Sequence, residues 1–402
     1  MAERPRHEVA EVFQRYLEAQ PVGPTGPAWS WEQRSVVEAI LACRTARLGG
    51  HVDACDACGQ RTISYNSCRN RHCPKCQGSA QALWLAARQA EVLPVPYAHV
   101  VFTIPQCLAP LALQNPTVVY DLLLRTAART LQEIAANPRH LGARLGFFTI
   151  LHTWGQTLVH HPHVHGVVPA GGLADDGRTW RPCRPGFFLP VRVLSRLFRG
   201  KLLAGLAEAF REGRIELHGH LAAYRSSAAF GRYLHEARRT EWVVYAKPPF
   251  DGPEHVLAYL ARYTHRIAIS NHRLLHVDDE RVTFRFKDYR SRRPRTLTLS
   301  LEEFARRFLL HVLPRGFVRI RYYGFLANAN RARLLDCCRD ALAQPEVAAV
   351  PKSERGGGDD EVVLDLLPHG LRLCPHCKHG ILRCVQVLVR PPPSLRAHRV
   401  AA

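Results

Sequence analysis

The chain has 402 residues, of which 47% are apolar and 22% charged, so disorder throughout the chain is excluded and two or three domains are expected. Its 55 Lys and Arg against 34 Asp and Glu give a net charge of +21. This excess indicates a polyanionic partner, with nucleic acid first and an anionic membrane surface second. Because only 6 of the 55 basic residues are lysines, the arginine excess is also open to interpretation as codon bias.

The sequence favours a cytoplasmic protein. No apolar run reaches the roughly 18 residues that a membrane span needs, and the opening MAERPRHEVAEVF has charges where a signal peptide would have its apolar core. Thirteen cysteines, several of them in CxxC pairs, suit metal binding in a reducing compartment better than a disulfide framework.

The apolar periodicity predicts both helices and strands, in an order that indicates an α+β fold with helices against one mostly antiparallel sheet. The predicted helices are 11–20, 31–50 after a Pro/Gly break, 78–93, 117–136, a basic amphipathic helix at 191–213 and 301–313, and the segment 255–269 is predicted to begin as a helix. The predicted strands are 97–104, the neighbouring pair 146–154 and 161–170, then 241–248, 272–277, 281–287 and 316–326. Residues 351–362 have the composition of a linker.

Two CxxC pairs near the N-terminus have the spacing of a zinc site. Cys55-Asp-Ala-Cys58 and Cys73-Pro-Lys-Cys76 are separated by fourteen residues. Since two such turns can present four thiolates to one tetrahedral Zn²⁺, the pattern predicts a structural zinc bound by these four cysteines. Cys68 and His72 are close enough in sequence to replace a ligand or to support a second metal.

Basic residues lie within and beside the same segment: Arg69, Arg71 and Lys75. A loop stiffened by a metal and carrying these charges suits contact with phosphate groups, so we expect DNA docking there rather than a purely structural role.

A further pair, Cys374-Pro-His-Cys377, lies near the C-terminus. It is open to two interpretations: half of another zinc site, with Cys337 and Cys338 as distant partners, or free thiols.

Three histidines alternate along one predicted strand. His161, His163 and His165 share a face because side chains of a strand alternate, and Val164 points to the opposite face, towards the core. Imidazoles spaced in this way can chelate a divalent ion. The third ligand is either His152, from the preceding strand, or His161. A polar edge strand is the alternative interpretation.

Two tyrosines lie one helical turn apart in HVLAYLARYTHR. Tyr259 and Tyr263 share a helix face and are flanked by Arg262 and Arg266. Aromatic pairs at this spacing are more often core residues than reactive ones. Tyr322 and Tyr323 are poorer candidates because adjacent side chains of a strand point to opposite faces.

Together, SYNSCRNRHCPKCQ (64–77), LHTWGQT (151–157), HPHVHGVVPAGGL (161–173), YLARYTHRIAISNHRL (259–274) and YYGFLAN (322–328) resemble the transposases of the insertion-sequence-91 family. This family belongs to the two-tyrosine HUH endonucleases, in which U is a bulky apolar residue. The resemblance runs from about residue 43 to 329, and the long motifs occur in the family's order.

The resemblance implies a role for each motif. His163-Val164-His165 is the HUH motif, Tyr259 and Tyr263 are the nucleophiles, and the four cysteines belong to an N-terminal zinc region. Related relaxases place a metal-binding histidine on the preceding strand, which favours His152. The implied domains are a helical and zinc-binding domain (1–92), a catalytic domain with an HUH-type antiparallel sheet (93–335) and a C-terminal tail (336–402).

The implied activity is metal-dependent cleavage and rejoining of single-stranded or locally melted DNA, with Mg²⁺ or Mn²⁺ at the histidines, a 5′-phosphotyrosine intermediate and no need for ATP. Such a protein would work in the bacterial cytoplasm, associated with the nucleoid. Two rivals remain: a plasmid relaxase or replication initiator with the same chemistry, and a non-catalytic zinc DNA-binding regulator. The sequence contains no GxxxxGK[ST] motif, which argues against a fused helicase of that type.

Overall fold

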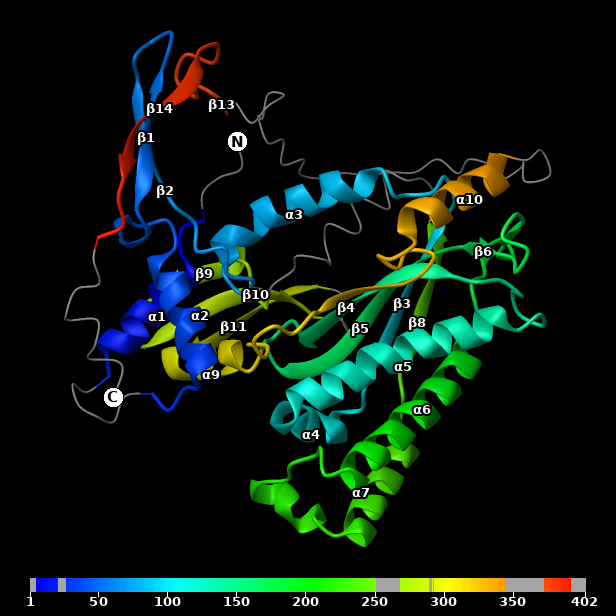
Figure 1. Ribbon diagram of the computed structural model, residues 1–402. Coiled ribbons are helices and arrows are strands. Elements are labelled where there is room, and N and C mark those ends of the chain that lie inside the picture. The colour runs from blue at the N-terminus through cyan, green and yellow to red at the C-terminus, as the bar shows by residue number, and fades with distance from the viewer. Residues whose placement is uncertain are drawn as a thin grey trace. The chain divides into compact units, whose positions relative to one another are not determined.

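The computed structural model describes residues 5–20, 27–250, 268–288, 291, 293–343 and 372–391. The chain divides into two compact units (Figure 1). The terminal unit consists of Met1–Ala80, Ile267–Val312 and Arg355–Ala402, and the central unit consists of Gln81–Arg266 and Leu313–Glu354.

The central unit is built on a five-stranded antiparallel sheet with the strand order β12-β4-β5-β3-β8. These strands are β12 (Ile320–Gly324), β4 (Gly146–Trp154), β5 (His160–Pro169), β3 (Tyr97–Thr103) and β8 (Val244–Phe250). A small two-stranded sheet, β6 (Gly171–Leu173) with β7 (Trp180–Pro182), follows β5. The predicted neighbouring strands are therefore β4 and β5, and the predicted α+β class is confirmed.

Helices cover one face of this sheet (Figure 1): α4 (Ala109–Gln114), α5 (Pro116–Ala136), α6 (Val191–Arg211) and α7 (Ser227–Arg239). The predicted amphipathic helix is α6, whose buried residues Leu194, Phe198, Leu202 and Leu206 recur every fourth position. They join one apolar cluster with alternate strand residues such as Phe102 and Val164. Apolar burial on this side fixes which strand residues point the other way.

The opposite face of the sheet carries a second apolar cluster along part of its length. Phe148, Ile150 and Val167 pack there with Leu335 of α10 (Arg331–Ala343). Trp84, from helix α3 (Pro74–Gln89), packs against the same cluster. Further along β4 and β5, this same face carries histidines instead of apolar side chains.

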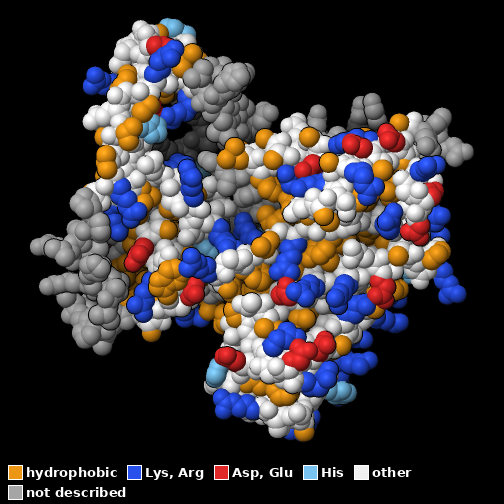
Figure 2. Space-filling model, in the orientation of Figure 1, with side chains coloured by type: hydrophobic (Ala, Val, Ile, Leu, Met, Phe, Trp, Pro, Cys, Tyr) orange, Lys and Arg blue, Asp and Glu red, His pale blue; other side chains and the backbone are white. Residues whose placement is uncertain are grey.

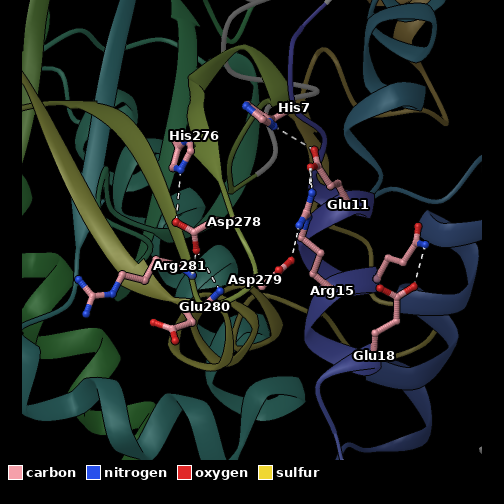
Figure 3. Close-up of polar contacts among 10 residues, drawn as sticks. His7, Glu11, Arg15, Glu18, His276, Asp278, Asp279, Glu280 and Arg281 are labelled. Atoms are coloured by element: carbon pink, nitrogen blue, oxygen red, sulfur yellow. Dashed lines mark hydrogen bonds and ion pairs between the residues drawn. The ribbon is translucent and has the colours of Figure 1, made fainter.

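The terminal unit combines three helices with a three-stranded antiparallel sheet of order β11-β10-β9. These elements are α1 (Val9–Glu18), α2 (Trp31–Ala42), α9 (Leu301–Leu309), β9 (Leu274–Val277), β10 (Arg281–Lys287) and β11 (Pro294–Ser300). Phe13 of α1 contacts Phe308 of α9 edge to face, with ring centroids 5.3 Å apart. Arg15 of α1 is ion-paired with Asp279, in the turn that joins β9 to β10 (Figure 3).

A second sheet of the terminal unit joins segments from near both ends of the chain. Its four strands have the order β13-β14-β1-β2. They are β13 (Arg372–Leu373), β14 (Ile381–Leu388), β1 (Gly50–Cys55) and β2 (Arg61–Tyr65). Because β14 pairs antiparallel with β1, residues near the C-terminus complete a sheet that begins near the N-terminus.

The compact units differ from the linear ranges 1–92, 93–335 and 336–402. Residues 267–312 belong with the N-terminal helices because α9 and β9 pack against α1, and residues 372–391 belong there because β14 pairs with β1. The predicted linker at 351–362 lies outside the described residues. Among the helices that the structure describes, none is both long and apolar enough to cross a membrane.

Candidate functional site

The β4–β5 hairpin brings three histidines together on one face of the central sheet. His152 of β4 is directly opposite His163 of β5, and His165 follows on the same face as its partner Ile150. Val164, between the two β5 histidines, is fully buried in the apolar cluster beneath the helices, as predicted. Burial of Val164 on one side therefore holds His163 and His165 on the other.

The three side chains have the spacing of a metal site. One ring nitrogen from each of His152, His163 and His165 lies within 4.8 Å of the others. The ring centroids of His152 and His165 are 4.4 Å apart, and those of His163 and His165 are 4.8 Å apart. Since a metal–imidazole bond is about 2.1 Å long, small side-chain rotations suffice to bring all three onto one ion. His161 is not a member of this group.

Hydrogen bonds behind the site determine which ring nitrogen faces it. Nδ1 of His163 donates to the backbone carbonyl of His161 at 2.6 Å, which leaves Nε2 as the nitrogen with a lone pair. Nδ1 of His165 lies 2.7 Å from Nε2 of His99, on the neighbouring strand β3, and the two rings are stacked. Burial, together with the positive charge of Lys247, lowers the pKa of His99 to about 3, so His99 is neutral.

The N-terminal cysteines form two clusters, not the single predicted site. Cys73 and Cys76, at the start of α3, meet Cys43 at the end of α2 and Cys68 in the intervening loop. The Sγ atom of Cys76 is 3.4 Å from that of Cys43 and 3.6 Å from that of Cys68. Cys68 is one of the two substitutes that the sequence predicts, and the other, His72, is not a member of the cluster. Cys43 is not predicted from the sequence, because it belongs to no CxxC pair.

Cys55 and Cys58 instead meet the C-terminal pair. Sγ of Cys55 is 3.6 Å from Sγ of Cys377, and Sγ of Cys58 is 3.8 Å from Sγ of Cys374. All four sulfurs lie within 4.8 Å of one another. Of the interpretations left open for the C-terminal pair, the one with Cys337 and Cys338 as distant partners is therefore wrong. Cys338 is buried in the apolar cluster beside α10.

The turn after Cys55 explains why the two N-terminal cysteine pairs lie in different clusters. Cys55 ends β1 and is followed by a tight turn into β2, which runs back along β1. This return places the Cys73 pair beside Cys43, near the opposite end of β1, and leaves the Cys55 pair at the tip of the hairpin. Antiparallel pairing with β14 then brings Cys374 and Cys377 to the tip.

Hydrogen bonds favour the thiolate form of particular sulfurs in both clusters. Neighbouring thiols, chiefly Cys68 and then Cys73, lower the pKa of Cys43 to about 7. Backbone N–H groups of His379 and Gly380 lower the pKa of Cys377 to about 6. Because zinc binds cysteine as the thiolate, these donor sets suit zinc.

The predicted nucleophiles Tyr259 and Tyr263 lie outside the described residues, as do Arg262 and Arg266. Tyr322 and Tyr323 point to opposite faces of β12, as predicted. The hydroxyl of Tyr322 accepts hydrogen bonds from Trp84 and Arg88, and the ring of Tyr323 is stacked on Phe147. Both rings therefore serve the packing of the sheet.

The predicted DNA-contacting residues beside the first cysteine cluster differ in their surroundings. Arg69 is exposed, and Arg71 is half-buried, with its pKa lowered by that burial. Lys75 is ion-paired with Glu8 at 2.6 Å. Lys and Arg side chains recur over the visible surface of the molecule (Figure 2).

Comparisons with known proteins agree with this combination of a cysteine-rich module and a histidine-bearing sheet. The family model described as "Putative transposase" matches residues 146–333, and that described as "Transposase zinc-binding domain" matches residues 9–104, which include the first cysteine cluster and support a structural zinc. The chain is 53% identical to "Putative transposase y4qJ" of Sinorhizobium fredii, over 96% of this chain and 97% of that protein.

A second relative is the transposase for insertion sequence element IS801 of Pseudomonas savastanoi pv. phaseolicola, 30% identical over 79% of this chain and 75% of that protein. Among solved structures, the conjugative relaxase TrwC in complex with oriT DNA is 17% identical over 40% of this chain and 70% of that chain. Its TM-score of 0.25 is too low to support a functional argument. On the evidence of the two family models and the two transposases, the chain belongs to the insertion-sequence-91 family of transposases.

Proposed function

We propose that this transposase cleaves and rejoins single-stranded or locally melted DNA through a covalent 5′-phosphotyrosine, in rolling-circle transposition within the bacterial cytoplasm. The observation that carries the proposal is the group of three histidines on one face of the central sheet, whose opposite face packs against the apolar core. A non-catalytic DNA-binding regulator would not need this group.

The donor set fits a divalent cation. Three imidazoles, with no carboxylate joining them among the described residues, favour Mn²⁺, and softer ions generally, over Mg²⁺, whose preferred ligands are oxygen atoms. His152, His163 and His165 would hold the ion, and when bound it supplies Lewis-acid polarisation of a non-bridging phosphate oxygen.

We assign His99 a positioning role behind this site. For Nε2 of His165 to offer a lone pair to the ion, Nδ1 of His165 must carry the proton and donate a hydrogen bond to Nε2 of His99. His99 can accept this hydrogen bond because it is buried and neutral. The contact fixes both the tautomer and the ring orientation of His165.

The nucleophiles in this proposal are Tyr259 and Tyr263. The phenolic oxygen of one tyrosine attacks the scissile phosphorus as the 3′-oxygen leaves, which yields a 5′-phosphotyrosine and a free 3′-hydroxyl. Because the phosphotyrosine bond conserves the energy of the phosphodiester, attack by a 3′-hydroxyl rejoins the strand without ATP. A second tyrosine, predicted from the sequence to lie one helical turn away, would be available to cleave a second strand while the first is occupied.

Basic residues would hold the DNA, and zinc would support the module that carries some of them. The proposed phosphate contacts are Arg69, Arg71, Lys75, Arg262 and Arg266. Lys75 would have to exchange its ion pair with Glu8 for a phosphate. The structural zinc belongs to the cluster of Cys43, Cys68, Cys73 and Cys76.

Cleavage of oligonucleotides from the ends of the mobile element tests the proposal. Wild-type protein should cleave in Mn²⁺ and not in excess EDTA, and His163→Ala should lower the cleavage rate at least 100-fold while DNA affinity changes less than about threefold. His140→Ala is the matched control, because His140 is exposed and outside the histidine group. Unchanged cleavage in EDTA would contradict the metal mechanism.

A further inference from the structure

We propose that Cys55, Cys58, Cys374 and Cys377 bind a second structural zinc, which fastens the C-terminal hairpin onto the N-terminal sheet. The site combines two cysteines from within the matched zinc-binding region with two that lie about 270 residues beyond its end. We call this group of four residues the clasp.

The distances between sulfurs match a tetrahedral ion. A zinc–sulfur bond of about 2.3 Å places tetrahedral ligands about 3.8 Å from one another. The clasp has sulfur pairs at 3.6 and 3.8 Å, and none of its sulfurs is more than 4.8 Å from another. A disulfide needs sulfurs about 2.05 Å apart, so the arrangement suits a shared ion better than two cross-links.

The two CxxC turns of the clasp have equivalent backbone hydrogen bonds. In the first turn, the N–H of Gly59 donates to the carbonyl of Cys55, and in the second, the N–H of Lys378 donates to the carbonyl of Cys374. Gly59 and Lys378 both have positive φ, 69° and 64°. Such a conformation is costly for a lysine, so its occurrence here indicates that the turn is shaped to present Cys374 and Cys377.

Backbone N–H groups also point at the sulfurs. Those of Ala57 and Cys58 lie 3.4 and 3.5 Å from Sγ of Cys55, and that of Gly380 lies 3.3 Å from Sγ of Cys377. Donors directed at sulfur stabilise thiolates, the form that zinc binds. The two cysteine turns thus face each other, and backbone N–H groups favour the thiolate form of the sulfurs that would bind the cation.

The turns also fit together closely. A methyl group added at Gly380 would overlap Sγ of Cys55, so the absence of a side chain lets the second turn approach the first. The N–H of Ile381 donates to the carboxylate of Asp56 at 2.7 Å, and Arg383 is ion-paired with the same carboxylate.

Apolar burial does not account for the position of β14. Val385, Val387 and Val389 on and beside this strand are 54%, 71% and 85% exposed, and the partner strand β13 has two residues. A short hairpin with so little buried apolar surface is marginal in water. Zinc binding at the clasp supplies the stabilisation that a hydrophobic core supplies elsewhere.

Metal analysis of the purified full-length protein tests the clasp. Each protein is prepared in a His163→Ala background, so that the histidine site does not hold zinc, and we expect two zinc ions in the parent chain, one in Cys374→Ser and two in Cys384→Ser. Cys384 is the matched control because it is an exposed cysteine on β14 and outside both clusters. One zinc per parent chain, or two in Cys374→Ser, would overturn the proposal.

A measurement on the wild type covers the case in which Cys374→Ser fails to fold. Cobalt substituted into both sites should give the absorption of two tetrahedral tetrathiolate ions per chain. Hydrogen exchange of residues 381–388 should quicken at least 100-fold when the metal is removed. Absorption from a single such ion, or exchange in β14 that does not respond to metal, would refute the clasp.

Discussion

The histidine site and the clasp differ in how far apart their ligands lie in the chain. His152 and His165 are 13 positions apart, on two strands that are paired in the middle of a five-stranded sheet. Cys58 and Cys374 are 316 positions apart, in turns that adjoin β1 and β14, and most residues of β14 are exposed. A metal bound at the histidines would therefore add chemistry to a structure that packing has already formed. A metal at the clasp helps to form the structure itself.

Removal of all bound metal should give the largest difference in hydrogen exchange between the clasp and the histidine site. Under reducing conditions, a zinc chelator should raise hydrogen exchange in 50–55 and 381–388 by at least 100-fold. Exchange in 146–154 and 160–169 should change by less than about threefold. The reason is that zinc binding to a cysteine site contributes about 10 kcal/mol or more, comparable to the stability of a whole domain. Equal loss of protection in both regions would contradict the comparison.

The third ligand of the histidine site gives the next largest effect. His152→Ala should weaken Mn²⁺ binding at least 100-fold, because it removes one of three protein ligands, whereas His161→Ala should weaken it less than about threefold. Electron paramagnetic resonance of free Mn²⁺ measures both affinities. A larger loss of Mn²⁺ affinity in His161→Ala than in His152→Ala would show that His161, and not His152, is the third ligand.

These two regions also show what could be predicted from the sequence. The alternation of His161, His163 and His165 around Val164 predicts a strand with one buried face, and local pairing with 146–154 brings in His152. By contrast, the C-x2-C-x14-C-x2-C spacing predicts one site and the structure has two clusters, because the hairpin turn after Cys55 separates the pairs. Residues 381–389 are mostly apolar, but nothing in that segment indicates that its strand partner, β1, lies more than 300 positions earlier in the chain.

Substitution of His99 should affect metal binding only through the orientation of the His165 ring. His99→Phe should weaken Mn²⁺ binding about tenfold, because the aromatic ring fills the space but cannot accept the proton of His165 Nδ1. His99→Gln should retain most of the affinity, since its amide oxygen can accept that hydrogen bond. Equal losses in the two variants would indicate a packing role only.

Acid should weaken the central unit through a buried histidine outside the metal group. Burial lowers the pKa of His160 to about 4, and its ring is hydrogen-bonded to the hydroxyl of Tyr120 at 2.8 Å. Between about pH 6.5 and 4 the unfolded chain binds a proton that the folded chain does not, so stability falls as pH falls through this window. The loss attributable to His160 is about 2 kcal/mol at pH 5.

Thermal unfolding of wild type and of His160→Gln at pH 7 and pH 5 measures this contribution. The variant keeps a polar partner for Tyr120 but cannot gain a proton, so its midpoint should fall less between the two pH values. A midpoint that falls as far as that of the wild type would show that other groups dominate the acid response.

The most direct test of the proposed activity is covalent capture of DNA. Wild-type protein in Mn²⁺ should form a denaturation-resistant adduct with a single-stranded oligonucleotide from the element end. A label at the 3′ end of the DNA should remain on the protein, because a 5′-phosphotyrosine retains the 3′ portion of the strand. The double variant Tyr259→Phe/Tyr263→Phe should bind the same oligonucleotide with unchanged affinity and form no adduct. An adduct formed by this double variant, or one that carries only a 5′ label, would contradict the account.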